Sequence, residues 1–295
     1  MSNASGQRAD GMLRVLNPEP AVLVPVSLGN PKPEVDDIAG LVEKFQASSL
    51  KEVGNGYLVD SPEAVVHLVD SLLDLPISSP SLYIDIEGVN LSRLGSVSIL
   101  QILVQPQDKT YLVDIHTLGS KAFDTAGVTG QTLKDILEST TIPKVFFDVR
   151  NDSDALFSHF GVNLACLQDI QLMELATRTF SRRCVNGLAR CIERDLAMTR
   201  SERQQWAEGK DKGRRLFAPE LGGSYEVFNL RPLAEEIALY CTQDVKLMPQ
   251  LWTLYSKRLS PAWASKVEIA TKDRIALSHT AEYNGKGKHM ALGPW

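Results

Sequence analysis

The stretch that decides the fold runs from residue 81 to residue 88 and reads Ser-Leu-Tyr-Ile-Asp-Ile-Glu-Gly. Its apolar, partly β-branched residues predict a buried β-strand. Asp85 and Glu87 lie within this run, and side chains two apart along a strand point to the same face. Two acids on a core strand repel each other unless a cation compensates them. The pair therefore indicates a site for a hard divalent ion, and two hydrated acids at an emerging strand end are the alternative.

The chain that follows this strand alternates between strand-like and helical patterns. Two further strand-like runs, over 97–104 and 110–115, come after short links that are typical of antiparallel connections. Next come a helix over 131–139, a strand over 144–147, a helix over 151–160, a strand over 164–170 and then almost entirely helical sequence. We expect an α/β fold with a mixed sheet of three antiparallel and two parallel strands, flanked by helices, and a helical C-terminal part.

The patterns also predict how the chain is divided. Before the main domain, helical spacing covers 34–48, a short strand covers 56–60, and a helix begins at Ser61-Pro62. The expected parts are a flexible arm over 1–33, an appended element over 34–80, the main domain over 81–260, and a C-terminal helix and tail over 261–295.

Composition excludes several classes of protein. The chain is 43% hydrophobic and 23% charged, which is typical of a globular protein. Its four cysteines lack the spacing of zinc sites or of a disulfide framework, which fits a reducing compartment. No apolar run approaches the length of a membrane span, and the N-terminus lacks the apolar core of a secretory signal. We expect an intracellular protein, cytoplasmic or nuclear, without a membrane partner.

Further acids and one tyrosine complete a candidate site. Asp152 and Asp154 follow a strand and open a helix, where helix capping is the alternative explanation. Far downstream, Tyr240 and Asp244 are four residues apart on a predicted helix, so a phenol and a carboxylate share one face. An ordinary Tyr–Asp surface pair is the alternative there.

In this order, Asp85-x-Glu87, Asp152 and Tyr240-x-x-x-Asp244 resemble the motifs of the DEDD 3′-5′ exonucleases. The tyrosine is similar to that of the DEDDy branch, which includes ribonuclease D and the Werner-type and proofreading exonuclease domains. The resemblance covers roughly residues 55–260 and implies a ribonuclease H-like fold. The segments 87–95 and 147–156 look most like the subgroup that contains Egalitarian, in which some members have lost metal ligands and serve as RNA-binding or adaptor proteins.

The resemblance implies a role for each residue. Asp85 would bridge two divalent ions, Mg²⁺ or Mn²⁺, Glu87 would bind one of them, Asp152 and Asp244 would supply the remaining carboxylates, and Tyr240 would orient the attacking water. Two such ions suffice for phosphodiester hydrolysis, because one activates water and the other holds the departing 3′ oxygen.

Phe147 and Asp154, near the predicted strand over 144–147, differ from or compete with the family pattern. Phe147 stands where ribonuclease D-like members often have histidine, and it is not a metal ligand. Asp154 competes with Asp152 for the role of ligand. The spacing from the strand end, and onward to Phe160-Gly161, favours Asp152.

A basic segment indicates a nucleic-acid partner. Residues 178–215 hold eleven Lys and Arg against five acids, although the net charge of the chain is −5. We predict that Arg203, Trp206, Arg214 and Arg215 bind the strand, through phosphate contacts and base stacking. A solvated helical face is the alternative.

The sequence therefore predicts a metal-dependent 3′-5′ exonuclease that acts on the 3′ end of single-stranded DNA or RNA by a two-metal-ion mechanism. One alternative is a catalytically silent nucleic-acid-binding or adaptor protein on the same fold. Another is a scaffold that binds protein partners through its apolar tail over 290–295.

Overall fold

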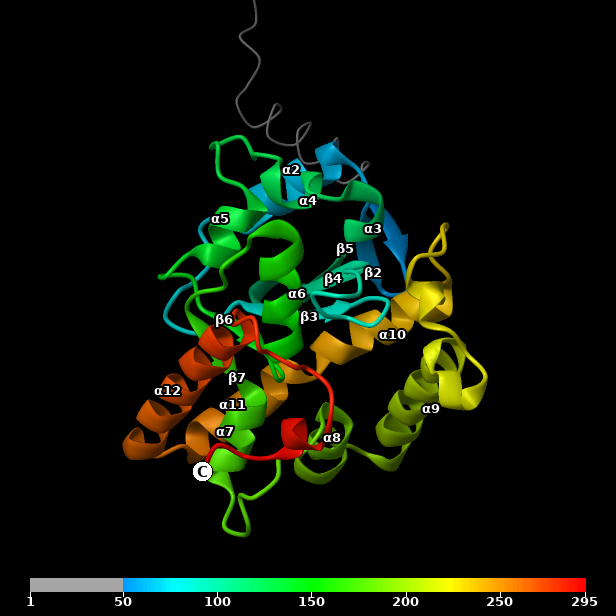
Figure 1. Ribbon diagram of the computed structural model, residues 1–295. Coiled ribbons are helices and arrows are strands. Elements are labelled where there is room, and N and C mark those ends of the chain that lie inside the picture. The colour runs from blue at the N-terminus through cyan, green and yellow to red at the C-terminus, as the bar shows by residue number, and fades with distance from the viewer. Residues whose placement is uncertain (1–49) are drawn as a thin grey trace, which may run out of the picture. The chain divides into compact units, whose positions relative to one another are not determined.

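The computed structural model describes residues 50–295, and Figure 1 shows how their helices and strands are arranged. The predicted arm over 1–33 and the predicted helix over 34–48 lie outside the described residues. Within the described part, one mixed sheet has the strand order β1-β2-β5-β4-β3-β6-β7. The strands are β1 (Lys51–Val53), β2 (Gly56–Val59), β3 (Leu82–Glu87), β4 (Ile99–Val104), β5 (Lys109–Asp114), β6 (Lys144–Phe146) and β7 (Leu167–Asp169).

Helices flank this sheet and make up most of the chain after β7 (Figure 1). The α-helices are α2 (Pro62–Ser71), α3 (Ile115–Leu118), α4 (Lys121–Asp124), α5 (Leu133–Glu138), α6 (Arg150–Phe160), α7 (Ile170–Thr177), α8 (Leu188–Asp195), α9 (Arg200–Phe217), α10 (Glu235–Lys246), α11 (Met248–Arg258) and α12 (Pro261–Ser278). Single 3₁₀ turns are η1 (Gln105–Gln107), η2 (Pro219–Leu221), η3 (Tyr225–Phe228) and η4 (Lys288–Ala291).

The pairing of the strands confirms the predicted mixed sheet. β3, β4 and β5 form an antiparallel meander, β6 pairs parallel with β3, and β7 pairs parallel with β6. β1 and β2 extend this sheet beyond the five predicted strands, because β2 pairs parallel with β5. Residues 51–59 are therefore built into the sheet, whereas the sequence analysis placed them in an appended element. Local sequence patterns do not reveal a parallel pairing across fifty residues of intervening chain.

Several helix starts follow the capping chemistry of their sequences. The side chain of Ser61 accepts a hydrogen bond from the backbone nitrogen of Ala64, with Pro62 in the first turn of α2. At the start of α9, Thr199 and Glu202 cap each other's backbone nitrogens in a capping box. Such caps satisfy donors that the first helical turn leaves unpaired.

The alternation of side chains along β3 decides where its two acids point. Leu82, Ile84 and Ile86 are buried in the core cluster that also holds residues of α2, α5 and α6. Tyr83 points to the other face and packs with residues of α7 and α11. Asp85 and Glu87 follow Tyr83 in the same alternation, so they face the side of the sheet against which α10 lies.

The C-terminal tail packs on the same body. Trp295 meets Trp263 of α12 edge-on, with ring centroids 5.2 Å apart, and Arg150 donates a hydrogen bond of 2.8 Å to the carbonyl oxygen of Met290. The terminal tryptophan therefore has an intramolecular partner, whereas the scaffold alternative needs this tail for a protein partner.

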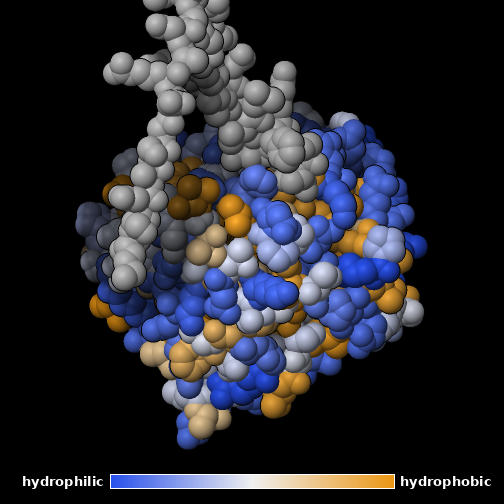
Figure 2. All heavy atoms as spheres, turned by 90° about the horizontal axis from the view of Figure 1, so that it is seen from above, coloured by the Kyte–Doolittle hydropathy of each residue, from blue (hydrophilic) through white to orange (hydrophobic). Residues whose placement is uncertain are grey.

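Neither the helices of the described residues nor the face visible in Figure 2 has the apolar character of a membrane-spanning segment. Among the helices of residues 50–295, none combines the length and apolarity that a membrane crossing requires. On the face seen in Figure 2, hydrophilic residues predominate, and hydrophobic residues lie in small separate groups between them.

Candidate active site

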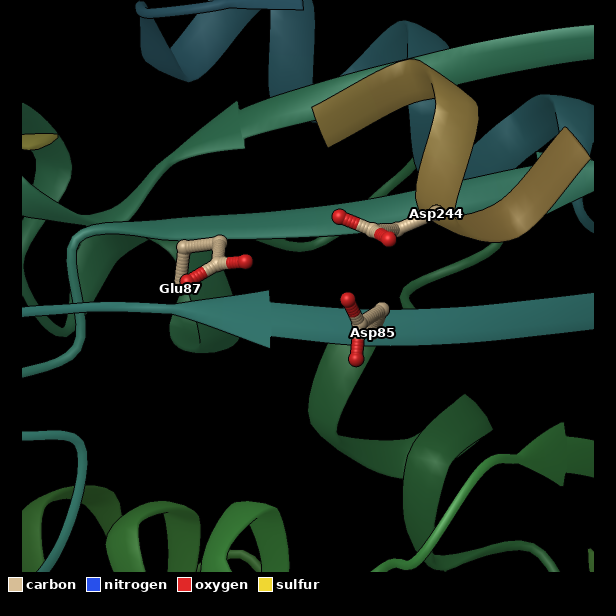
Figure 3. A group of neighbouring side chains, drawn as sticks. All are labelled: Asp85, Glu87 and Asp244. Carbon is tan, nitrogen blue, oxygen red and sulfur yellow. The ribbon is translucent and has the colours of Figure 1, made fainter. Parts of the chain in front are cut away.

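Three carboxylates from two elements meet beside the sheet. Asp85 and Glu87 come from β3, and Asp244 comes from α10 (Figure 3). One carboxylate oxygen of each lies within 4.8 Å of those of the other two. Residues 159 positions apart in the chain thus form one acidic cluster, as the sequence analysis predicted for these three acids.

The position of α10 is fixed by its buried side and by the turn between β1 and β2. Ile237, Cys241 and Val245 are fully buried. The hydroxyl of Thr242 donates a hydrogen bond of 2.9 Å to the carbonyl oxygen of Gly54. A Cβ atom at Gly54 would lie 2.5 Å from the backbone nitrogen of Leu239, so a larger residue in this turn would push the helix away. These contacts hold Asp244 over β3.

The electrostatics of the cluster favour a bound cation. Burial, and after it the charge of Asp244, raises the pKa of Asp85 to about 7. Burial and the charges of Asp85 and Asp244 raise the pKa of Glu87 well above its ordinary value. The Oδ2 atom of Asp244 is buried and has no hydrogen-bond partner in the described part of the chain. An all-oxygen, mutually repelling donor set with a free buried oxygen fits a hard divalent ion.

Asp152 lies near this cluster but is not one of the three converging acids. It stands in the first turn of α6 and is 5% exposed. Burial, and then the charge of Asp85, raises its pKa well above the ordinary value, which places the two acids in each other's field. Asp154 instead accepts hydrogen bonds from Arg93, at 2.6 Å from Nε and 2.8 Å from the backbone nitrogen. Asp154 thus has a cationic partner, whereas Asp152 interacts with the cluster through the charge of Asp85.

This difference predicts opposite effects of two isosteric substitutions on stability. Asp154→Asn leaves Arg93 without its counter-ion, and because Arg93 is partly exposed we expect a loss of about 2–3 kcal/mol, somewhat below the usual cost of breaking a buried pair. Asp152→Asn removes a repelling charge, so the free energy of unfolding should stay constant or rise. Urea unfolding in EDTA measures both. Equal losses in the two variants would contradict the assignment of Asp152 to the cluster.

Tyr240 stands one helical turn before Asp244 on the same face of α10. The ring of Phe217 packs edge-on against its ring, with centroids 4.8 Å apart. Burial raises the pKa of Tyr240 far above its ordinary value, and the charges of Asp244, Glu87 and Asp85 add to the shift. The phenol therefore stays protonated, so it can act as a hydrogen-bonding group and not as a phenolate. Phe147 packs against the apolar cluster around Tyr83.

The four residues predicted to bind nucleic acid lie on α9. Trp206 is 7% exposed and lines a cavity of about 430 Å³, together with Arg214, Tyr240 and Asp244. Arg214 pairs with Glu220 at 3.0 Å, and Arg215 pairs with Asp211 at 2.8 Å; both arginines keep more than half of their side chains exposed. Arg203 donates a hydrogen bond of 2.7 Å to the carbonyl oxygen of Glu193. Of the four residues, Trp206 and Arg214 therefore line a cavity that Asp244 also lines, and Arg203 and Arg215 do not.

One residue at the site was not predicted. The ammonium group of Lys210, on α9, pairs with Asp244 and lies 3.7 Å from the centroid of the Tyr240 ring. From the sequence, Lys210 is only one of the eleven basic residues of the segment 178–215. The glycines at 209 and 213, four residues apart, are the signal that could have found it, because such spacing allows two helices to approach closely.

Comparison with protein families places most of the chain in one of them. The family model for 3′-5′ exonucleases matches residues 58–259. The mouse piRNA biogenesis protein EXD1 is 28% identical over 212 residues, which cover 65% of this chain and 34% of that protein. The human protein of the same name is 35% identical over 106 residues, which cover 36% of this chain and 19% of that protein. The matched part thus spans about a third of the mouse relative's length and about a fifth of the human relative's length.

Solved structures share the fold. The RNase D of Trypanosoma brucei, crystallised with RNA U12, has a TM-score of 0.62 and 19% identity, with 80% of this chain and 75% of that chain covered. The RNase D of Escherichia coli has a TM-score of 0.53 and 18% identity, with 77% and 51% covered. These similarities confirm the predicted mixed sheet flanked by helices as the fold of such exonucleases.

Proposed function

This chain belongs to the 3′-5′ exonuclease family, and on that premise we propose that it is a metal-dependent enzyme that hydrolyses the 3′-terminal phosphodiester bond of single-stranded nucleic acid. The observation that carries the proposal is the convergence of Asp85, Glu87 and Asp244, whose ligand oxygens lie within 4.8 Å of one another. A purely structural role for three buried acids that share a single lysine is costly, whereas a metal site requires such acids.

We assign the metal ligands to these three acids and to Asp152. Asp85 interacts with both other acids, because the charge of Asp244 raises the pKa of Asp85 and the charge of Asp85 raises the pKa of Asp152. It is therefore the ligand proposed to be shared by two ions, Mg²⁺ or Mn²⁺. When bound, such ions supply charge neutralisation for the leaving 3′ oxygen and lower the pKa of water.

Tyr240 has a separate proposed role. Its phenol is held protonated by its buried, acidic surroundings, and Asp244 is its neighbour on the same helix face. We propose that the hydroxyl holds the attacking water by a hydrogen bond, so that the water is aligned for in-line attack. Neither a serine nor a cysteine nucleophile is part of this assignment.

The names of the relatives favour RNA over DNA as the first substrate to test. The Trypanosoma brucei neighbour was crystallised with RNA, and the mouse relative is named for piRNA biogenesis. We therefore propose RNA as the first substrate to test, with DNA of the same sequence beside it. The 2′-hydroxyl is the group by which a protein distinguishes the two.

The polarity of cleavage tests the proposed function. We expect mononucleotides to leave a 5′-labelled single strand from its 3′ end in Mn²⁺, so that a ladder of shortened labelled strands forms. A strand with a blocked 3′ end should stall, and a circular strand of the same sequence should stay intact. Cuts in the circular strand would show an endonuclease and contradict the proposal.

The arginines at the end of α9 provide a second test, of binding. Arg214→Ala with Arg215→Ala should raise KM and reduce the salt dependence of KM, with kcat little changed, because phosphate contacts steer the strand but do no chemistry. The matched control is Lys257→Ala with Arg258→Ala, an exposed basic pair at the end of α11. If the α9 variant keeps the wild-type KM and salt slope, these arginines form only a solvated surface.

A further inference from the structure

Helix α9 approaches the catalytic face of α10 unusually closely. A Cβ atom at Gly213 would lie 2.5 Å from the Cβ atom of Tyr240, and one at Gly209 would lie 2.3 Å from Nε2 of Gln243. At position 213 a larger residue would require one helix to move, because the Cβ atom of Tyr240 is fixed to the backbone of α10, whereas at position 209 the side chain of Gln243 would have to turn away. Apart from Trp206 and Gly213, the residues of α9 lie at least partly exposed, so these few positions hold the helix on its neighbour. Figure 1 shows α9 beside α10 on one side of the molecule.

The close approach brings one lysine into the acidic cluster. Lys210 lies between the two glycines, and its side chain is only 18% exposed. Its ammonium pairs with Oδ1 of Asp244 and rests over the ring of Tyr240, 3.7 Å from the centroid. The other oxygen of Asp244, Oδ2, is buried without a hydrogen-bond partner in the described part of the chain. Asp244 is thus half satisfied by the lysine.

The charge of Lys210 reaches beyond Asp244. It opposes the rise in the pKa of Asp85, of Glu87 and of Asp244. Within residues 50–295, no other cationic side chain is among the groups that act on all three acids. A single ammonium therefore partly neutralises an acidic cluster that is suited to divalent charge.

We propose that Lys210 is an internal counter-ion that a divalent metal must displace from Asp244. This inference rests on the proposed function, because it concerns the same four carboxylates. In the metal-free protein the ammonium stabilises the cluster and so stabilises the fold. In the metal-loaded protein the ammonium gives up Asp244 and faces the cavity of about 430 Å³ that it lines with Trp206 and Arg214. The lysine thereby lowers the affinity for metal and raises the stability of the metal-free protein.

A purely structural lysine would behave differently. If Lys210 only ties α9 to α10, its removal should lower stability and leave metal affinity unchanged or weaker. If it is a counter-ion, its removal should lower stability without metal and raise the affinity for metal. Only a counter-ion gives lower stability together with higher metal affinity on removal, because the ammonium and the metal compete for one carboxylate.

The experiment compares Lys210→Met with wild type and with Lys212→Met, which removes an exposed lysine from the same helix. Isothermal titration with MnCl₂ at constant pH gives Kd, and thermal unfolding in EDTA gives Tm. We expect K210M to lower the Kd for Mn²⁺ about tenfold. This change is larger than a solvent-exposed ion pair would give, because the pair of Lys210 with Asp244 is largely buried. Its Tm in EDTA should fall below that of wild type, and K212M should match wild type in both measurements.

A second measurement needs no substitution. Limited acetylation of wild-type protein by an amine-reactive ester, followed by mass spectrometry, gives the labelling rate of each lysine. Lys210 should react slowly in EDTA and severalfold faster in Mn²⁺, while Lys212 serves as the internal control. Equal rates for Lys210 in both conditions would overturn the proposal.

The outcomes separate this inference from the proposed function. Binding of Mn²⁺ by wild type with an unchanged or higher Kd in K210M overturns the counter-ion role and leaves the metal-dependent function standing. Absence of Mn²⁺ binding in both proteins contradicts both proposals. Binding by K210M alone supports the counter-ion role and shows that the lysine keeps wild type empty.

Discussion

Asp85→Asn is expected to lower kcat by at least about 10³-fold, because the charge stabilisation that metal ions provide at a phosphodiester is worth several kcal/mol. Asp85 lies in the field of both Asp244 and Asp152, so its loss disturbs every proposed ligand arrangement at once. The measurement is single-turnover cleavage of a 5′-labelled strand in saturating Mn²⁺. Activity within tenfold of wild type would rule out the shared-ligand assignment.

The controls for Asp85→Asn use the raised pKa of this residue. A carboxylate whose pKa in the folded protein is about 7 destabilises the fold when it is charged, so the variant should melt at or above the wild-type temperature in EDTA at pH 8. Asp124→Asn, in an exposed acid of α4, is the matched substitution far from the cluster and should keep full activity. A fall in Tm of Asp85→Asn would point to a structural role for this acid.

Tyr240→Phe is expected to lower kcat by about 10²-fold, the lower end of the range for a positioned proton-handling group. The substitution keeps the ring, so its packing against Phe217 and the glycine contact of α9 should survive. What it removes is the hydroxyl, which is proposed to hold the attacking water. Metal affinity should therefore hardly change, and added Mn²⁺ should not restore the rate.

Asp244→Asn is the matched comparison for Tyr240→Phe on the same helix face. It removes a proposed ligand, so it should weaken Mn²⁺ binding and regain part of its rate when more Mn²⁺ is added. A titration of both variants with Mn²⁺ makes the comparison. Rescue of Tyr240→Phe by metal, or a wild-type rate in that variant, would contradict the role of the tyrosine.

The sequence predicted those features that depend on local patterns. The strand around Asp85 was predicted because its apolar residues alternate with the acids, and β3 has the expected bounds to within one residue. The convergence of Asp85, Glu87 and Asp244 followed from the order of the motifs and from a resemblance to known exonucleases. The choice between Asp152 and Asp154 rested on spacing alone, and the ion pair of Arg93 with Asp154 is a feature that spacing does not reveal.

Features that depend on tertiary packing were not visible in the sequence. Lys210 is thirty residues from Tyr240 and reaches its ring because Gly213 lets the two helices approach closely. Trp206 was predicted to stack on bases, and its burial beside the site, where it lines a cavity, was not visible in the sequence. Charge and aromaticity along the chain indicate a partner, but burial is decided by contacts between distant elements.

Displacement of Lys210 from Asp244 by metal would also affect how the strand binds. If Lys210 leaves Asp244 when metal binds, its ammonium becomes available beside Arg214, at the approach of the strand. Metal and strand would then favour each other's binding, because the metal replaces Lys210 as the partner of Asp244 and a phosphate of the strand becomes the new partner of Lys210. The same arrangement would help the metal-free protein to stay folded in spite of its clustered acids.

The central claim is that the chain is an enzyme and not a silent binding module on an exonuclease fold. The most direct measurement is a single-turnover assay with excess wild-type protein and a 5′-labelled single-stranded RNA, in Mn²⁺ and in EDTA, with binding of the strand followed in parallel. We predict a ladder of 3′-shortened products in Mn²⁺ and an intact strand in EDTA. If the protein binds both the strand and Mn²⁺ but leaves RNA and DNA strands intact, the claim is wrong and the chain is a binding module.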